Sequence, residues 1–98
     1  MNYANEIRKH RRIAILRFLS DSPEYTSNAS LLTDVLRGVG VTSTFDQVTT
    51  ELVWLQQNGF VTFDPHASYP VVTSTASGAE IASGIATHPE IQRPRPRA

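Results

Sequence analysis

The side chains that could perform catalysis or hold a metal are few and scattered along the chain. The sequence contains no cysteine, which excludes a disulfide, a thiolate zinc site and a cysteine nucleophile. Its histidines, His10, His66 and His88, fall in three separate predicted elements, so we expect no metal site. It also lacks a glycine-rich phosphate loop, a His-Glu-x-x-His motif and a serine in a nucleophile elbow. The sequence therefore predicts a protein with no catalytic residues, no metal and no cofactor.

Basic side chains gather at the two ends of the chain, although the formal net charge is zero. Residues 1–17 have a net charge of +4, residues 18–90 of −7 and residues 91–98 of +3. Such an asymmetry indicates contact with nucleic acid or with an acidic surface. The alternative is a solvated helix face and a solubilising tail. The basic residues that we predict to contact DNA phosphates are Arg8, Arg11, Arg12, Arg37, Arg93, Arg95 and Arg97.

A third predicted helix, which begins after Ser43 or Thr44 and is stopped by Asn58-Gly59, has a polar face that suits the DNA major groove. Its apolar spacing puts four side chains in the core, namely Phe45, Val48, Leu52 and Leu55. On the opposite face, glutamine can pair with adenine through two hydrogen bonds, and threonine can contact a thymine methyl group. This face has no lysine or arginine, so the two ends of the chain would have to neutralise the phosphates. The residues that we predict to contact DNA from this helix and its start are Ser43, Thr44, Gln47, Thr50, Trp54 and Gln57.

Two of these residues have a structural interpretation as well. In the interpretation that we favour, Trp54 packs against the neighbouring elements, because buried aromatic area contributes strongly to a core. In the alternative interpretation, Trp54 stacks on a partner. Ser43 can cap the helix through its hydroxyl and touch a phosphate with the same group. Thr44 followed by Gln47 offers an alternative capping box.

Hydrophobic periodicity and turn residues predict one domain, residues 1–87, and an extended or disordered tail, residues 88–98. The expected elements are a helix from residue 3 to about 19, a helix from 28 or 30 to 38 or 40, the third helix that is stopped by Asn58-Gly59, strands over 60–63 and 69–73, and a helix from 76 to about 86. This is a mainly α protein with a two-stranded β-hairpin. Its longest apolar stretches are four or five residues, which predicts a cytoplasmic protein with neither a membrane span nor a signal peptide.

The first predicted helix has two apolar stripes and therefore needs two partners. Ile15, Leu16 and Leu19 form the stripe that faces the core, and a second stripe lies elsewhere on the helix. The last helix contains Gly78 and Gly84, which weaken it, so we expect it to be held by packing on that second stripe. If the cover is incomplete, the remaining surface forms a homodimer interface. The residues predicted for this interface are Tyr3, Ile7, Ala14, Phe18, Ile81 and Ile85.

Two stretches, LVWLQQNGFV at residues 52–61 and VTSTASG at residues 72–78, resemble parts of the winged helix-turn-helix family. The first resembles the end of the recognition helix as it enters the wing. The second resembles the return strand of the wing and the Thr-x-x-Gly start of the last helix. With the order helix, helix, helix, strand, strand, helix, the resemblance implies a winged helix-turn-helix domain with a two-stranded wing.

The sequence GIATHPEIQRP at residues 84–94, behind such a domain, is similar to small proteins of Mu-like bacteriophages and prophages. Those proteins are often labelled as regulators of the arsenic-repressor type. The resemblance implies a non-catalytic, dimeric transcriptional regulator that binds duplex DNA in the bacterial host cell. The residues leave a second hypothesis open, in which the same fold is an assembly or packaging adaptor that binds another phage protein and not DNA. The acidic middle of the chain and the cation-free third helix favour this alternative.

Overall fold

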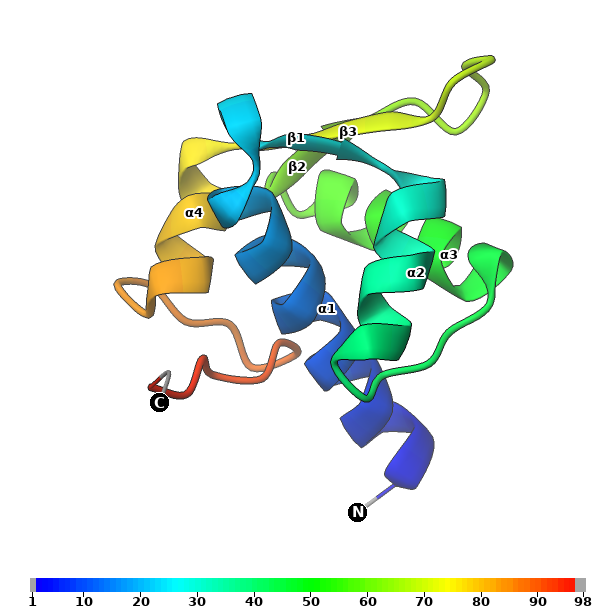
Figure 1. Cartoon of the computed structure of the whole chain (residues 1–98). Coiled ribbons are helices and arrows are strands. Elements are labelled where there is room, and N and C mark those ends of the chain that lie inside the picture. Colours follow the sequence, from blue (N-terminus) through cyan, green and yellow to red (C-terminus); the bar gives the residue numbers. More distant parts are fainter. Residues whose placement is uncertain (1, 97–98) are drawn as a thin grey trace.

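The computed structural model describes residues 2–96 and shows a mainly helical α+β protein (Figure 1). Within these residues there are four α-helices and a three-stranded antiparallel sheet. In chain order the elements are α1 (Tyr3–Asp21), a 3-10 turn (Pro23–Tyr25), β1 (Thr26–Asn28), α2 (Ala29–Gly38), α3 (Phe45–Gln57), β2 (Val61–Phe63), β3 (Val71–Ser74) and α4 (Ala76–Ser83). The sequence order of the predicted elements is therefore confirmed, with one strand added.

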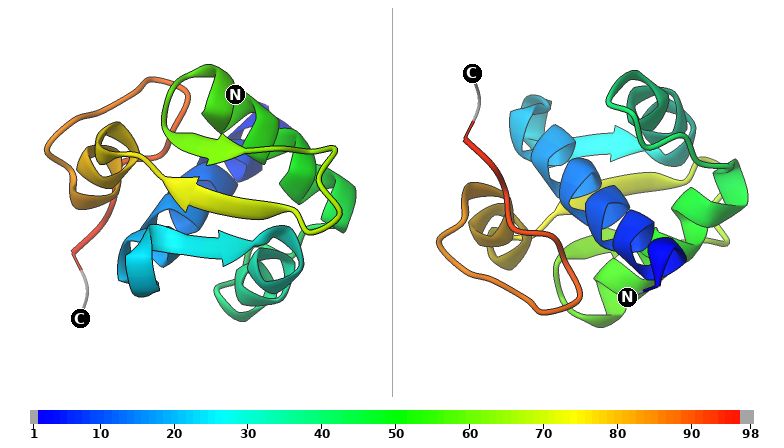
Figure 2. Two further views of the ribbon diagram at one scale, coloured as in Figure 1. Left: turned by 90° about the horizontal axis from the view of Figure 1, so that it is seen from above. Right: turned by 90° about the horizontal axis from the view of Figure 1, so that it is seen from below.

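The added strand, β1, corrects the prediction of a two-stranded hairpin. The strand order is β1-β3-β2, with Thr73 of β3 opposite both Thr26 and Thr62 (Figure 2). The hydroxyl groups of Thr26 and Thr73 lie 2.9 Å apart, and the Ala29 amide donates to the Pro70 carbonyl at 3.2 Å. The strand sequence Thr-Ser-Asn has no apolar alternation, so this strand forms by pairing with the free edge of β3 and not from local propensity.

Side-chain caps set where the helices begin. Asn28 starts α2 by accepting from the Leu31 amide at 2.8 Å, as one of the two predicted starts requires. Thr44 and Gln47 form the reciprocal capping box of α3, so Ser43 is not the cap. At the other end of the chain, α4 stops at Ser83 because Gly84 adopts a left-handed conformation with φ of 88°. The predicted extension of α4 to residue 86 is therefore wrong.

The core lies between α1, α2, α3 and the sheet. Ile15, Leu16 and Leu19 of α1 are fully buried, which confirms the predicted core stripe. They meet apolar side chains of α2, α3 and β3, namely Leu32, Leu36, Val48, Leu52, Leu55 and Val72. Phe45 is the exception in α3, because it lies in the first helical turn with 47% of its surface exposed. Its assignment to the core was wrong.

The second apolar stripe of α1 is arranged differently from the prediction. α4 packs against α1, but Ala14 and Phe18 line a hollow between α1 and the end of α2. Ile81 is buried in the core of its own chain, so it is not available to a second copy and is removed from the predicted dimer interface. Tyr3 and Ile85 are about four-fifths exposed. The homodimer itself stays a prediction.

The C-terminal segment follows α4 without forming a helix or strand over residues 87–96. It runs back beside α1, as the right-hand view of Figure 2 shows. Ile91 is buried, and the Gln92 amide donates to the Lys9 carbonyl at 3.2 Å. As far as residue 96 the predicted tail is thus part of the folded structure, and Arg97 lies outside the described residues.

Candidate nucleic-acid interface

The most buried charged group of the described chain is Glu51 of α3, which is 1% exposed. Arg8, Arg11 and Arg12 of α1 surround its carboxylate, at N···O distances of 3.0, 3.4 and 2.8 Å. Residues three and four apart share one face of a helix, so the spacing 8, 11, 12 turns all three side chains toward α3. We call these four residues the Glu51 cluster.

Each of the two buried arginines also donates a hydrogen bond to a partner outside Glu51. Arg11 donates to the Ser43 hydroxyl at 2.7 Å, and Arg12 donates to the Glu90 carbonyl at 2.8 Å. The Arg12 guanidinium also lies 3.8 Å from the centre of the Trp54 ring, a cation–π contact that stabilises a desolvated cation. These contacts offset the desolvation of the buried charges and tie α1, α3 and the C-terminal segment together.

This burial corrects part of the predicted phosphate-binding set. Arg11 and Arg12 are only 5% and 3% exposed, so they are held inside the cluster and do not offer their charge to a phosphate directly. The side chain of Arg8 keeps 44% of its surface exposed. Three arginines and one glutamate leave the cluster with a net charge of +2, and Arg8 is the arginine of the cluster that reaches the surface.

The exposed edge of the cluster meets the polar face of α3. A hollow between the two helices is lined by Ala4, Ile7, Arg8 and Arg11 of α1 and by Asp46, Gln47, Thr50 and Glu51 of α3. Gln47 and Thr50 are both exposed. The Gln47 side-chain oxygen accepts from the Thr44 amide at 2.9 Å, which leaves its NH2 group for an outside acceptor. The structure therefore brings Arg8, Gln47 and Thr50, which the sequence assigned to DNA contact, to one place.

Trp54 is half-buried and takes the structural position that we favoured. Besides the contact with Arg12, its ring meets His88 edge to face at a centroid distance of 5.3 Å, and His88 meets Phe60 in the same way at 5.7 Å. His88 was assigned no role from the sequence. This stack anchors the C-terminal segment beside the end of α3, and it turns Trp54 away from an outside partner.

The other predicted contact residues lie apart from this hollow. Ser43 is buried as the acceptor of Arg11, and Thr44 and Gln57 are exposed at opposite ends of α3. Arg37 is exposed at the end of α2. Arg93 and Arg95 are exposed in the C-terminal segment, where they line a different hollow with Arg17. The structure thus divides the predicted basic residues between separate surfaces.

The comparison with known proteins links the chain to a bacteriophage. The Escherichia phage Mu protein named uncharacterized protein gp26 is 38% identical over 88 residues, which span 90% of this chain and 91% of that protein. The chain belongs to the gp26 family of phage Mu. No family model and no solved structure matches the chain.

The gp26 relationship confirms the predicted phage connection and covers nearly the whole chain. The name of the Mu protein assigns it no activity. In the described part of this family member, no three histidine, cysteine, aspartate or glutamate side chains gather as a metal would require. No helix among residues 2–96 has the length and apolar character to cross a membrane.

The anchoring role of His88 in this gp26 family member leads to a prediction. We expect His88→Ala to loosen the C-terminal segment, because it removes two edge-to-face contacts that contribute about 0.5–1.5 kcal/mol each. Hydrogen exchange at the Gln92 amide, which bonds to Lys9, should become at least several-fold faster. His66→Ala is the matched control, since His66 is exposed in the loop between β2 and β3. Unchanged protection of Gln92 in the His88 variant would contradict the anchor.

Proposed function

We propose that this protein binds duplex DNA without catalysing a reaction, as a winged helix-turn-helix protein. Support comes from the arrangement of α2, a short turn and α3, followed by the strands β2 and β3. The loop over residues 64–70 projects from the body of the molecule as a wing would (Figure 1). The strand β1, which closes the other edge of the sheet, is compatible with this arrangement.

The observation that carries the proposal is the hollow in which Arg8, Gln47 and Thr50 meet. Arg8 supplies a partly exposed positive charge for a phosphate. The free NH2 group of Gln47 and the methyl group of Thr50 are available to base edges in the major groove. Because the Glu51 cluster is already folded around Arg8, this guanidinium is held in place before DNA arrives, which lowers the entropy cost of binding.

The proposed role in the infected cell is regulation of transcription. The phage relationship and the polar surface that α3 presents support this role. In this role the exposed face of α3 contacts the bases of duplex DNA, and α1 supplies phosphate contacts at the edge of that face. On this proposal the protein acts in the cytoplasm of the bacterial host, where the phage genome is transcribed.

Thr50→Glu tests the proposed surface. The new carboxylate would stand in the hollow beside Arg8, where it repels phosphates and competes for the guanidinium. We expect the affinity for a mixed-sequence duplex at about 50 mM salt to fall by about ten-fold or more. Fluorescence anisotropy with a labelled duplex measures this change.

Ser77→Glu is the matched control, because Ser77 is an exposed residue of α4 and adds the same charge outside the hollow. It should leave the duplex affinity within about two-fold of the wild type, a small change because a lone surface charge far from the DNA is screened by salt. Equal losses in both variants would mean that overall charge, and not the α3 surface, governs binding. Circular dichroism confirms that both variants remain folded.

A specific observation favours the adaptor alternative. The faces of α3 and of the 64–70 loop carry no lysine or arginine, and they expose Phe45 and Tyr69 at 47% and 83%. Exposed aromatic side chains are typical anchors of protein interfaces. On this alternative the protein binds another phage protein and has no measurable affinity for duplex DNA, so the same titration separates the two functions.

A further inference from the structure

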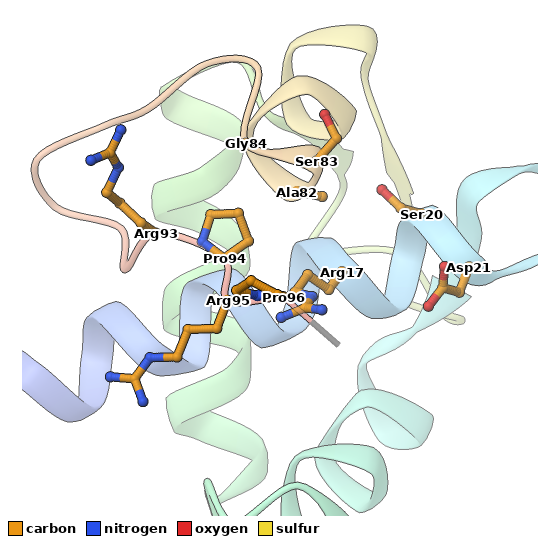
Figure 3. Close-up of a pocket in the computed structure, with 10 residues that line it drawn as sticks. All are labelled: Arg17, Ser20, Asp21, Ala82, Ser83, Gly84, Arg93, Pro94, Arg95 and Pro96. Carbon is orange, nitrogen blue, oxygen red and sulfur yellow. The ribbon is translucent and has the colours of Figure 1, made fainter. Parts of the chain in front are cut away.

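A second group of arginines lies on another side of the molecule, around a hollow of about 700 Å³ (Figure 3). The hollow lies between the second half of α1, the end of α4 and the C-terminal segment. Arg17, Arg93 and Arg95 line it, and Asp21 is the acidic residue among the described lining residues. We call this the tail surface. Its lining groups carry more positive than negative charge.

The backbone that carries Arg93 and Arg95 is held in place. Ile91 is buried and the Gln92 amide bonds to Lys9 on α1, immediately before the first of these arginines. Pro94 and Pro96 alternate with the arginines, and proline fixes φ near −65°. The two guanidiniums therefore project from an ordered segment, so less conformational entropy is lost when they bind a ligand.

Two serines, Ser20 and Ser83, also line the hollow. The Ser20 hydroxyl is buried and has no hydrogen-bond partner among the described residues, so it is closed to a ligand in this structure.

The direction of the arginines indicates the kind of ligand. In Figure 3 the guanidiniums of Arg93 and Arg95 point outward and away from each other, and neither points toward the serines. Such groups do not converge on one small anion, but they can each meet a different phosphate of an extended chain. No large aliphatic or aromatic side chain is among the described lining residues. This argues against a membrane surface, which requires an apolar anchor, and against a protein interface, which requires buried hot spots.

We infer that the tail surface binds the phosphate backbone of nucleic acid as a second surface, separate from the α3 hollow. Arg17 follows Arg8 by nine residues, which places the two about 180° apart around α1 and about 13 Å apart along it. Arg8 and Arg17 therefore lie on different sides of α1, and the α3 hollow and the tail surface share no lining residue. The inference rests on the proposed function and deepens it, because it assigns part of the affinity to contacts that do not depend on base sequence.

The test is the double variant Arg93→Gln, Arg95→Gln, titrated with a mixed-sequence duplex over a series of salt concentrations. Each phosphate contact contributes about 0.9 to the slope of log K against log salt. We expect the slope of the variant to be shallower by about two, and its affinity at about 50 mM salt to be lower by about ten-fold or more. Both side chains are exposed, so the thermal unfolding curve should not move.

Arg93→Gln and Ser77→Glu form a matched pair of single variants. Both lower the net charge by one at an exposed position, but Ser77 lies on α4 outside the lining of both hollows. The Arg93 variant should change the slope by about one, and the Ser77 variant should change it by clearly less. Equal effects would overturn the inference, because they would show a response to net charge alone.

The remaining outcomes separate this inference from the proposed function. If the wild type binds duplex DNA and Thr50→Glu weakens it while the double arginine variant has no effect, the tail surface is not a nucleic-acid site and the α3 proposal stands. If the wild type does not bind DNA, both fail. Vesicles that contain anionic lipid are the third probe. Binding to them that depends on Arg93 and Arg95, without DNA binding, would assign the surface to membranes and overturn the inference.

Discussion

We expect Glu51→Gln to lower the free energy of unfolding by about 3–5 kcal/mol, the loss typical when one partner of a buried ion cluster is removed. Glutamine has nearly the same shape, so the packing of α1 on α3 is kept while the negative charge is lost. Arg11 and Arg12, which are almost fully buried, would then be two uncompensated cations. For a domain of this size, that loss is a large part of the total stability.

Urea unfolding followed by circular dichroism measures this loss, and Asp46→Asn is the matched control. Asp46 is on the same helix but exposed, so its amide variant should differ from the wild type by at most about 0.5 kcal/mol. A loss of less than about 1 kcal/mol in the Glu51 variant would contradict the buried cluster. The arginines would in that case be solvated and free to bind phosphates, as the sequence analysis assumed.

Gly78→Ala is the second substitution with a large expected effect, a loss of about 1–3 kcal/mol in the free energy of unfolding. Gly78 lies in the first turn of α4, where an added Cβ would collide with the Phe60 carbonyl oxygen and crowd the Ser74 hydroxyl. Both neighbours belong to the strand ends on which α4 is seated, and the carbonyl is backbone that already accepts from the Thr75 amide. The clash can be relieved only by moving α4 off the sheet.

Gly38→Ala separates this close approach from helix propensity. Gly38 ends α2 with nothing within 4 Å of an added Cβ, so alanine there should raise the free energy of unfolding by about 0.5–1 kcal/mol. Thermal or urea unfolding of the two variants should therefore give changes of opposite sign. A stabilised Gly78 variant would show that α4 is not seated against the strands as described.

The helices were predictable from the sequence because their signals are local. The apolar spacing of Ile15, Leu16 and Leu19 defined the core face of α1, and Thr44 with Gln47 was one of two predicted starts of α3. Both signals depend on residues within one or two turns of each other. The loop between β2 and β3 was predictable for the same reason, since it contains its own turn residues.

The features that the sequence did not reveal depend on contacts between distant residues. Glu51 is about forty residues away from the arginines that bind it. The residues next to Glu51 in the chain do not identify those partners. Two signals were nevertheless present. Glu51 directly precedes Leu52 on the buried side of α3, and the spacing 8, 11, 12 turns three arginines to one side of α1. A carboxylate at a core-flanking position beside such a set is a candidate for a buried ion cluster.

The ordered attachment of the C-terminal segment was not predicted, for a related reason. Its prolines excluded a helix correctly, but its attachment depends on His88 between Trp54 and Phe60 and on the buried Ile91. These partners come from α3, the following strand and α1, so composition alone indicated only an extended or disordered tail. The ordered attachment is what places Arg93 and Arg95 on a defined surface.

The central claim, that this gp26 family member binds duplex DNA, is tested most directly by the salt dependence of its affinity for a mixed-sequence duplex. The account predicts measurable binding at about 50 mM salt and a slope of log K against log salt of about −3 or steeper, since Arg8 and the arginines of the tail surface each meet a phosphate. The absence of binding at about 50 mM salt would contradict the claim, and so would an affinity that does not change with salt.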